Sequence, residues 1–275
     1  MRLQNGDKWP VVYHGNGPAK NNDIWKRLVD RFEKLEPWQE RKPKIEGITV
    51  LTWSIPSETT LLERSFEKMG IRDELIVIPL SKPINWLDKI KKTREYLQKI
   101  ETKYVMGLDS TDIIVSTDQE GQKTLWYDIK ETFKSMNCKL LYNAEKLNWP
   151  SSNGHGTDIK EEDGRNGELL KALIRTEKLE EDVYKDFAGS SFFRMNSGAF
   201  IGYTDFTKTF YDDLWRNYVS THYDGGMNEN FFGGDQGFIR IMQDKYFPDL
   251  RADCHCEIFQ TFADINESDI TGVYS

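Results

Sequence analysis

Residues 104–115 read Tyr-Val-Met-Gly-Leu-Asp-Ser-Thr-Asp-Ile-Ile-Val, two apolar runs joined by a short acidic segment. The first run predicts a buried strand, and Asp109 and Asp112 leave it at its carboxyl end. Burying two carboxylates without a partner is costly, and a divalent cation offsets that cost. Carboxylate oxygens suit Mg²⁺ or Mn²⁺, so we expect these two residues to bind metal. The alternative is that Asp109 caps a turn or a helix.

Short β-rich runs alternate with amphipathic stretches on both sides of this segment. The further runs that we expect to be strands are residues 11–14, 48–53, 74–80, 139–142, 199–203 and 258–260. Helical spacing is clearest where one face carries Trp86, Leu87, Ile90, Leu97 and Ile100. The alternation predicts an α/β fold with a mostly parallel central sheet flanked by helices. Ligands of such sheets bind beyond the carboxyl ends of the strands, so we expect the chemistry there.

The composition narrows the class of protein. The chain has 275 residues, of which 38% are hydrophobic and 30% charged, and its formal net charge is −8. It is long enough to bury a large core, and it is neither collagen-like nor a disulfide scaffold. The negative charge disfavours nucleic acid and anionic lipid as partners. Apolar runs of about 18 residues and a signal peptide are both missing, which predicts no membrane span and a cytoplasmic location, in a host cell if the chain is viral.

Two further polar segments adjoin predicted elements. Asn196, Ser197 and Gly198 offer hydrogen bonds and a close backbone approach to a hydroxylated ligand, unless they form a simple turn. Asp235 and Gln236 open a predicted helix, where a carboxylate is by default an N-cap.

The segment His14-Gly15-Asn16-Gly17-Pro18-Ala19-Lys20 also follows a predicted strand. Its glycines let the backbone approach an anion, Lys20 adds positive charge, and the imidazole of His14 can bind a metal ion. Taken alone, a histidine in such a segment is more often a loop residue than a ligand.

The three cysteines, Cys138, Cys254 and Cys256, cannot all form pairs. Cys254-His255-Cys256 has the spacing of a metal clip, but a closed zinc site needs four ligands. We therefore interpret the segment as an ordinary cysteine pair at a strand end, in a reducing compartment.

Together these segments resemble a GT-A glycosyltransferase, and more narrowly the glycosyltransferase domain of procollagen lysyl hydroxylases and its viral and microbial relatives. The matching segments keep their order and rough spacing over about residues 46–262, and they are residues 48–52, 105–114, 143–150, 196–203, 235–236 and 256–260. Each segment is modest alone, but several in order are specific. The resemblance implies a GT-A, Rossmann-like fold.

One segment departs from the order of that family. There the Val-His-Gly-Asn-Gly-Pro segment comes last, whereas Val-Tyr-His-Gly-Asn-Gly-Pro comes first here, at residues 12–18. We interpret the chain as a circularly permuted single domain over residues 1–275. Residues 1–45 are then the permuted segment, 46–262 the core and 150–190 an insertion or lid. Permutation is tolerated where termini lie close together at the surface. The alternative is that the segment is accidental or serves a neighbouring domain.

The resemblance implies a role for each matched position. Asp109, Asp112 and His14 hold Mn²⁺ (or Mg²⁺), which bridges the diphosphate of a UDP-sugar. The catalytic candidates are Asp235 and Gln236, near the reacting carbon, and Glu145, which equally suits an N-cap or a salt bridge. The residues expected to bind the nucleotide sugar are Thr52, Trp53, Trp86, Ser110, Thr111, Asn196, Ser197, Gly198, Gly15, Asn16, Gly17 and Lys20.

Thr111 is a second departure, because the family tends to carry an aromatic residue there that stacks on the uracil. Trp53 or Trp86 can take over that contact. We expect Trp86 to belong to the buried face of its own helix rather than to stack on a base.

The resemblance implies a metal-dependent hexosyltransferase that moves glucose or galactose from a UDP-sugar to a hydroxyl group. The acceptor is then a hydroxylysine in a collagen-like peptide, a glycan or a small hydroxylated molecule. Other classes stay open: a non-catalytic nucleotide- or glycan-binding module of the same fold, and a UDP-sugar hydrolase or nucleotidyltransferase with the same metal site. The sequence does not distinguish a retaining from an inverting reaction.

Overall fold

The structure is a computed structural model that describes residues 10–37, 45–55, 59–82, 84–115, 122–157, 159–160, 164–223 and 231–265. Parts of the expected permuted segment, residues 1–9 and 38–44, lie outside the described residues. Within the expected insertion, residues 158 and 161–163 also lie outside them.

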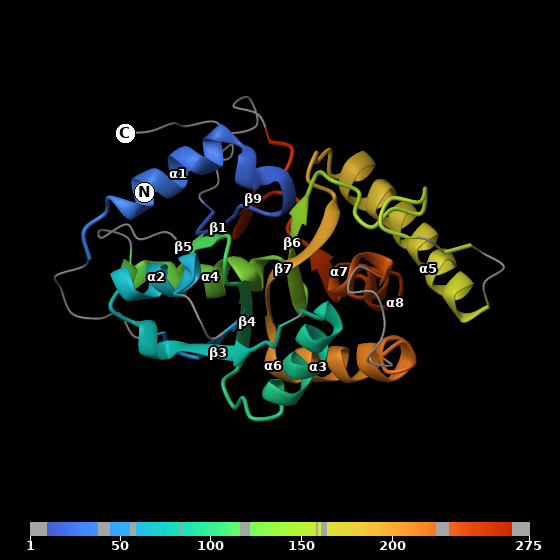
Figure 1. Ribbon diagram of the computed structural model, residues 1–275, viewed down its shortest axis with the longest axis horizontal. Coiled ribbons are helices and arrows are strands. Elements are labelled where there is room, and N and C mark those ends of the chain that lie inside the picture. Colours follow the sequence, from blue (N-terminus) through green and yellow to red (C-terminus); the bar gives the residue numbers. More distant parts are fainter. Residues whose placement is uncertain are drawn as a thin grey trace.

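The larger of two sheets in the described residues has six strands in the order β3-β2-β4-β7-β6-β8 (Figure 1). These strands are β2 (Ile48–Ser54), β3 (Leu75–Pro79), β4 (Tyr104–Asp109), β6 (Leu140–Glu145), β7 (Arg194–Tyr203) and β8 (Leu250–Ala252). Strand β7 runs antiparallel to both of its neighbours, and the other pairs are parallel. The prediction of an α/β fold with a mostly parallel sheet is therefore confirmed.

The smaller sheet brings together three segments that are far apart in the sequence. Strand β1 (Val12–His14) lies between β5 (Ile113–Val115), to which it is antiparallel, and β9 (Phe259–Thr261), to which it is parallel. The first described strand thus pairs with the last one. It also pairs with the strand that directly follows the two aspartates, so it lies beside the carboxyl end of β4.

Helices cover both faces of the larger sheet. They are α1 (Asp23–Glu33), α2 (Leu61–Lys68), α3 (Trp86–Leu97), α4 (Gln122–Ser135), α5 (Arg165–Glu180), α6 (Thr204–Leu214), α7 (Asp235–Arg240) and α8 (Met242–Tyr246). Among the described residues, three further segments are 3₁₀-helical, namely η1 (Gly17–Asn21), η2 (Arg72–Glu74) and η5 (Phe231–Gly233), and two are π-helical, namely η3 (Glu181–Phe187) and η4 (Trp215–Val219). Asn22 and Asn85 cap α1 and α3, and Thr60 and Glu63 form a capping box on α2.

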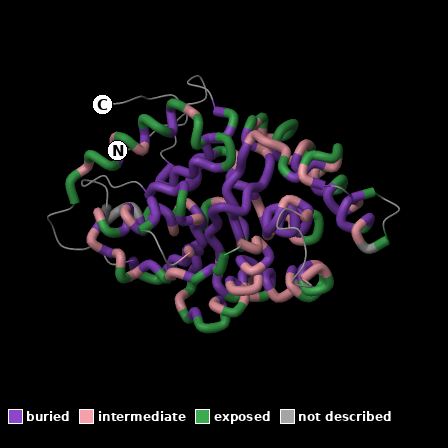
Figure 2. Tube along the Cα trace, viewed as in Figure 1, coloured by how far each residue is buried: buried purple, intermediate pink, exposed green. Residues whose placement is uncertain are grey.

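Two apolar cores follow from the alternation of side chains along the strands. On β7, Phe200 packs in the core that includes residues of α3 and α6, whereas Ala199 and Ile201 face the core that includes residues of α2 and α4. Figure 2 shows the buried residues gathered at the centre, along the strands. The apolar side chains of the sheet therefore fill a core on each of its faces.

Two strands differ from expectation. Strand β7 begins at Arg194, so residues 196–198 lie inside a strand and do not form a turn. Strand β8 was not predicted, because its three residues carry too little pattern. Helix α5 continues directly into the π-helical η3. In the described part of the chain, every helix is too short or too polar to cross a membrane.

Candidate metal centre and its cavity

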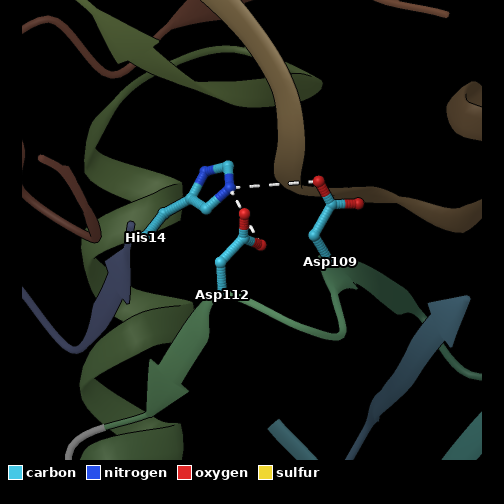
Figure 3. Close-up of side chains that lie close together, drawn as sticks. All are labelled: His14, Asp109 and Asp112. Atoms are coloured by element: carbon cyan, nitrogen blue, oxygen red, sulfur yellow. Dashed lines mark ion pairs between the residues drawn. The ribbon is translucent and has the colours of Figure 1, made fainter. Parts of the chain in front are cut away.

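Three predicted metal ligands meet where the two sheets adjoin. Asp109 is the last residue of β4, Asp112 directly precedes β5, and His14 is the last residue of β1. Nε2 of His14 lies 3.5 Å from Oδ1 of Asp112 and 3.9 Å from Oδ2 of Asp109, and the three side chains point toward one another (Figure 3). Two ligand atoms each about 2.1 Å from one ion are about 3–4 Å apart. The group therefore fits a divalent ion.

Backbone and side-chain hydrogen bonds fix the three ligands. The N–H of Gly15 donates to the carbonyl of Asp112 at 2.7 Å, which ties the end of β1 to the acidic segment. The amide nitrogen of Asn143 lies 2.9 Å from Nδ1 of His14, and the two form a hydrogen bond that orients the ring. Asn143 was not predicted as a site residue, although it is the first residue of the matching segment 143–150.

Gly198 provides the space for this group. A Cβ at this position would lie 2.1 Å from Cε1 of His14 and 2.8 Å from Oδ2 of Asp109. No side chain fits at such distances, so glycine here is required by the packing of β7 against the ligands.

The charges around the group favour a cation. Burial alone would lower the pKa of His14, but the carboxylates of Asp112, Asp109 and Glu145 outweigh burial and raise it. Burial also raises the pKa of Asp109. A bound divalent ion relieves the same excess of negative charge without a proton.

Lys89 is the site residue that the sequence analysis missed. It is buried on α3, and its ammonium lies 2.7 Å from Oδ1 of Asp109 and 2.9 Å from Oδ2 of Asp235. The ammonium also lies over the ring of Trp53, 4.5 Å from the centroid. The signal was a lysine three residues after Trp86, on the apolar face of a predicted helix. The two carboxylates outweigh burial and raise the pKa of Lys89, which keeps it charged.

A cavity of about 510 Å³ opens beside the metal group, and most of the predicted site residues line it. The predicted residues that line it are His14, Asn16, Gly17, Trp86, Asp109, Asp112, Glu145, Asn196, Ser197, Gly198, Asp235 and Gln236. Segments from six regions of the chain thus face one space.

Glu145 and Gln236 form a buried network in the floor of this cavity. Nε2 of Gln236 donates to Oε1 of Glu145 at 2.7 Å, and Asn16 donates to Oε2. Asn196 donates to Oε1 of Gln236 at 2.9 Å. Burial raises the pKa of Glu145, although the neighbouring amides of Asn196 and Gln236 oppose the shift. Glu145 is the last residue of β6 and no helix begins directly after it, so it is not an N-cap.

A second cavity of about 240 Å³ shares four residues with the first, namely Trp86, Lys89, Asp109 and Asp112. Its walls include the predicted residues Lys20, Trp53, Ser110 and Thr111. Nζ of Lys20 lies 3.3 Å from Oδ2 of Asp112. We expected Trp86 to belong to the buried face of its helix. It is instead half-buried and lines both cavities, so it is not a pure core residue.

Some predicted residues lie elsewhere than expected. Thr52 is fully buried and lines neither cavity. Gly15 also lines neither cavity, and its backbone N–H donates a hydrogen bond to the carbonyl of Asp112. Asp235 is the first residue of α7, after Gly234 at the cap position, and its carboxylate contacts Lys89. The default reading of Asp235 as an N-cap is therefore wrong.

The cysteine segment is separate from this site. Among the described residues, His14, Asp109 and Asp112 form the one group of potential ligands close enough to hold an ion. Cys138, Cys254 and Cys256 form no disulfide bond, and burial raises the pKa of the Cys254 thiol to about 12. Cys254 and His255 line a different cavity of about 570 Å³ that shares no residue with the other two.

Comparisons with known proteins add no family to this picture: neither the family models nor the curated proteins that were searched match the chain. What the fold and the site define is an α/β protein with a buried His-Asp-Asp group fit for a metal ion.

Proposed function

We propose that the protein is a metal-dependent glycosyltransferase that moves a hexose, glucose or galactose, from a UDP-sugar to a hydroxyl acceptor. The observation that carries the proposal is the meeting of His14 with Asp109 and Asp112, beside a cavity that also holds Asp235 and residues 196–198. These are the segments on which the resemblance to the glycosyltransferase domain of procollagen lysyl hydroxylases rests.

The metal group and Lys20 suit a diphosphate. An ion held by His14, Asp109 and Asp112 supplies charge that stabilises a leaving nucleoside diphosphate. Lys20 lies at the second cavity beside Asp112, where its ammonium can contact a phosphate oxygen. The permuted order is supported by β1, which pairs with both β5 and β9 and so brings His14 to the aspartates.

The two adjoining cavities, of about 510 and 240 Å³, bind different parts of the donor. The smaller one, with Trp53 and Thr111 in its walls, suits the nucleoside, and Trp86 at the junction offers an aromatic face in place of the residue lacking at position 111. The larger one suits the hexose, because Asn196 and Ser197 present hydrogen-bonding groups there.

Asp235 is the carboxylate that acts on the reacting groups. Lys89 holds it in the wall of the larger cavity and links it to Asp109. In an inverting reaction this carboxylate takes the proton of the acceptor hydroxyl, and in a retaining reaction it orients the sugar. Product stereochemistry distinguishes the two roles.

Release of UDP from a panel of UDP-sugars, with and without Mn²⁺ and without acceptor, tests the proposal. Slow release from one sugar nucleotide only when Mn²⁺ is present supports a transferase and names the donor. Fast release that no acceptor increases identifies a hydrolase instead. Binding of UDP and Mn²⁺ without turnover of any sugar nucleotide, even with acceptors added, identifies a non-catalytic module.

A further inference from the structure

The segment after β6, residues 147–157, forms one wall of the larger cavity without helix or strand. Trp149 in this wall has 42% of its surface exposed, and a Cβ on Gly156 would lie 2.8 Å from the indole ring. The ring therefore rests on the backbone of Gly156. A large aromatic side chain that lines a cavity and stays exposed is placed for contact with a ligand.

Arg240 supports this wall from α7. Its Nη1 donates to the carbonyl of Pro150, and its Nη2 donates to Oδ1 of Asn148 at 2.7 Å, so it bonds the residues on both sides of Trp149. Both Arg240 and its partner Glu180 are fully buried, with Nη2 of Arg240 2.6 Å from Oε2 of Glu180. A buried ion pair is often no more stabilising than apolar packing. Stability alone therefore does not account for an arginine at this position.

Glu177, one turn before Glu180 on α5, supports the same segment from a second helix. Its carboxylate accepts hydrogen bonds from Nδ2 of Asn148 at 2.9 Å and from the N–H of Ser152 at 3.0 Å. The amide of Asn148 is thus bonded through its oxygen by Arg240 and through its nitrogen by Glu177. It cannot rotate without losing both bonds, which fixes the residue next to Trp149.

We propose that Arg240 and Glu177 are positioning residues that hold Trp149 as the wall against which the acceptor binds. This inference rests on the proposed function, in which the nucleoside takes the smaller cavity and the hexose lies in the larger one, so that the acceptor approaches the hexose there, against the Trp149 wall. An indole face contacts C–H surface, which a sugar ring or a lysine-type side chain presents next to its hydroxyl group.

Fluorine NMR of the full chain labelled with 5-fluorotryptophan tests the positioning role. Loss of one signal in Trp149→Phe assigns that residue. Glu177→Gln and Arg240→Lys shift and broaden the Trp149 signal, because each loses part of a fixed hydrogen-bond geometry. Arg175→Gln is the matched control: it lies on the same helix and removes only a surface pair with Asp244, so the Trp149 signal stays unchanged.

Kinetics with a hydroxylysine-containing collagen peptide and with free galactose as acceptor probes test the consequence. Glu177→Gln raises the acceptor KM about tenfold and leaves acceptor-free UDP release within about twofold. An unchanged Trp149 signal in Glu177→Gln overturns the proposal, whether or not Arg240→Lys folds. So does a fall in Mn²⁺-dependent UDP binding that parallels the KM change, since that reports a general loss of structure. Wild-type protein that does not bind UDP with Mn²⁺ contradicts the proposed function instead, and the fluorine signal still decides the positioning role.

Discussion

The imidazole of His14 occupies the space that a side chain at position 198 would need. A Cβ on Gly198 would lie 2.1 Å from Cε1 of His14, far inside van der Waals contact. The two residues belong to β1 and β7, from opposite parts of the chain, so the metal group depends on how closely these strands approach.

Gly198→Ala is therefore expected to displace His14 and to weaken Mn²⁺ binding about tenfold or more. Electron paramagnetic resonance of free Mn²⁺ measures that affinity. Ala199→Gly, on the opposite face of β7, is the control and keeps wild-type affinity. Unchanged Mn²⁺ binding in Gly198→Ala would show that His14 is not a ligand.

Lys89→Met is expected to reduce Mn²⁺-dependent turnover about 100-fold, a typical loss when a group that positions a reacting residue is removed. The ammonium holds Asp109 and Asp235 together, and methionine keeps the bulk of the chain without the charge. Steady-state UDP release measures the effect. Lys92→Met, on the same helix with its ammonium at the surface against the carbonyl of Pro79, retains wild-type turnover. Full activity of Lys89→Met would remove the lysine from the mechanism.

Glu180→Gln is expected to destabilise the protein in a pH-dependent way. Burial alone would raise the pKa of Glu180, but Arg240 and Arg194 outweigh burial and lower it from the usual 4.5. The folded state then binds fewer protons than the unfolded state. The stabilisation of the folded state by ionised Glu180 is therefore present above about pH 4.5, and it is lost as the pH falls through the lower folded-state pKa.

At pH 7 the variant leaves Arg240 buried without its partner, which costs about 3–5 kcal/mol of unfolding free energy. Urea unfolding at pH 7 and below pH 4 measures the difference in unfolding free energy between wild type and Glu180→Gln. We expect this difference to be smaller at the lower pH. Glu168→Gln, at the exposed start of α5, unfolds like wild type at both values. A difference that is the same at both pH values would rule out the ionised pair as its source.

Replacing both Cys254 and Cys256 with serine is expected to leave the Mn²⁺ dependence of UDP release unchanged. The segment lies beside a separate cavity, and its thiols are not part of the metal group. Elemental analysis of the purified protein provides a second measurement. Zinc bound to wild type and absent from the double variant would mean that the cysteine segment holds a metal after all.

The position of the metal group was predictable because it depends on patterns that are local in sequence. Asp109 and Asp112 follow an apolar run, and this place at a strand end predicted them as ligands. His14 follows another such run, but its role as a ligand came from the resemblance, because a histidine in such a segment is by itself more often a loop residue. The spacing of these residues did not predict which strands lie next to each other. That inference came from the resemblance to a glycosyltransferase domain. The pairing of β1 with β5 and β9 supplies the physical reason for that meeting.

The residues that were missed are single polar groups buried inside regular elements. Lys89 is one of 37 lysines and arginines, and only its place on an apolar helix face distinguished it. Arg240 and Glu180 are 60 residues apart and find each other through tertiary packing. Thr52 was assigned through the resemblance, but its side chain is fully buried on the face of β2 opposite to Trp53, and only Trp53 lines the smaller cavity.

Calorimetric titration of UDP into the protein, with and without Mn²⁺, tests the central claim most directly. The account predicts that wild type binds UDP only when Mn²⁺ is present, and that Asp112→Asn, which keeps the shape of the side chain but not its charge, loses this binding. Equal UDP binding without metal, or undiminished Mn²⁺-dependent binding in Asp112→Asn, would contradict a metal centre of His14, Asp109 and Asp112 that binds a nucleoside diphosphate.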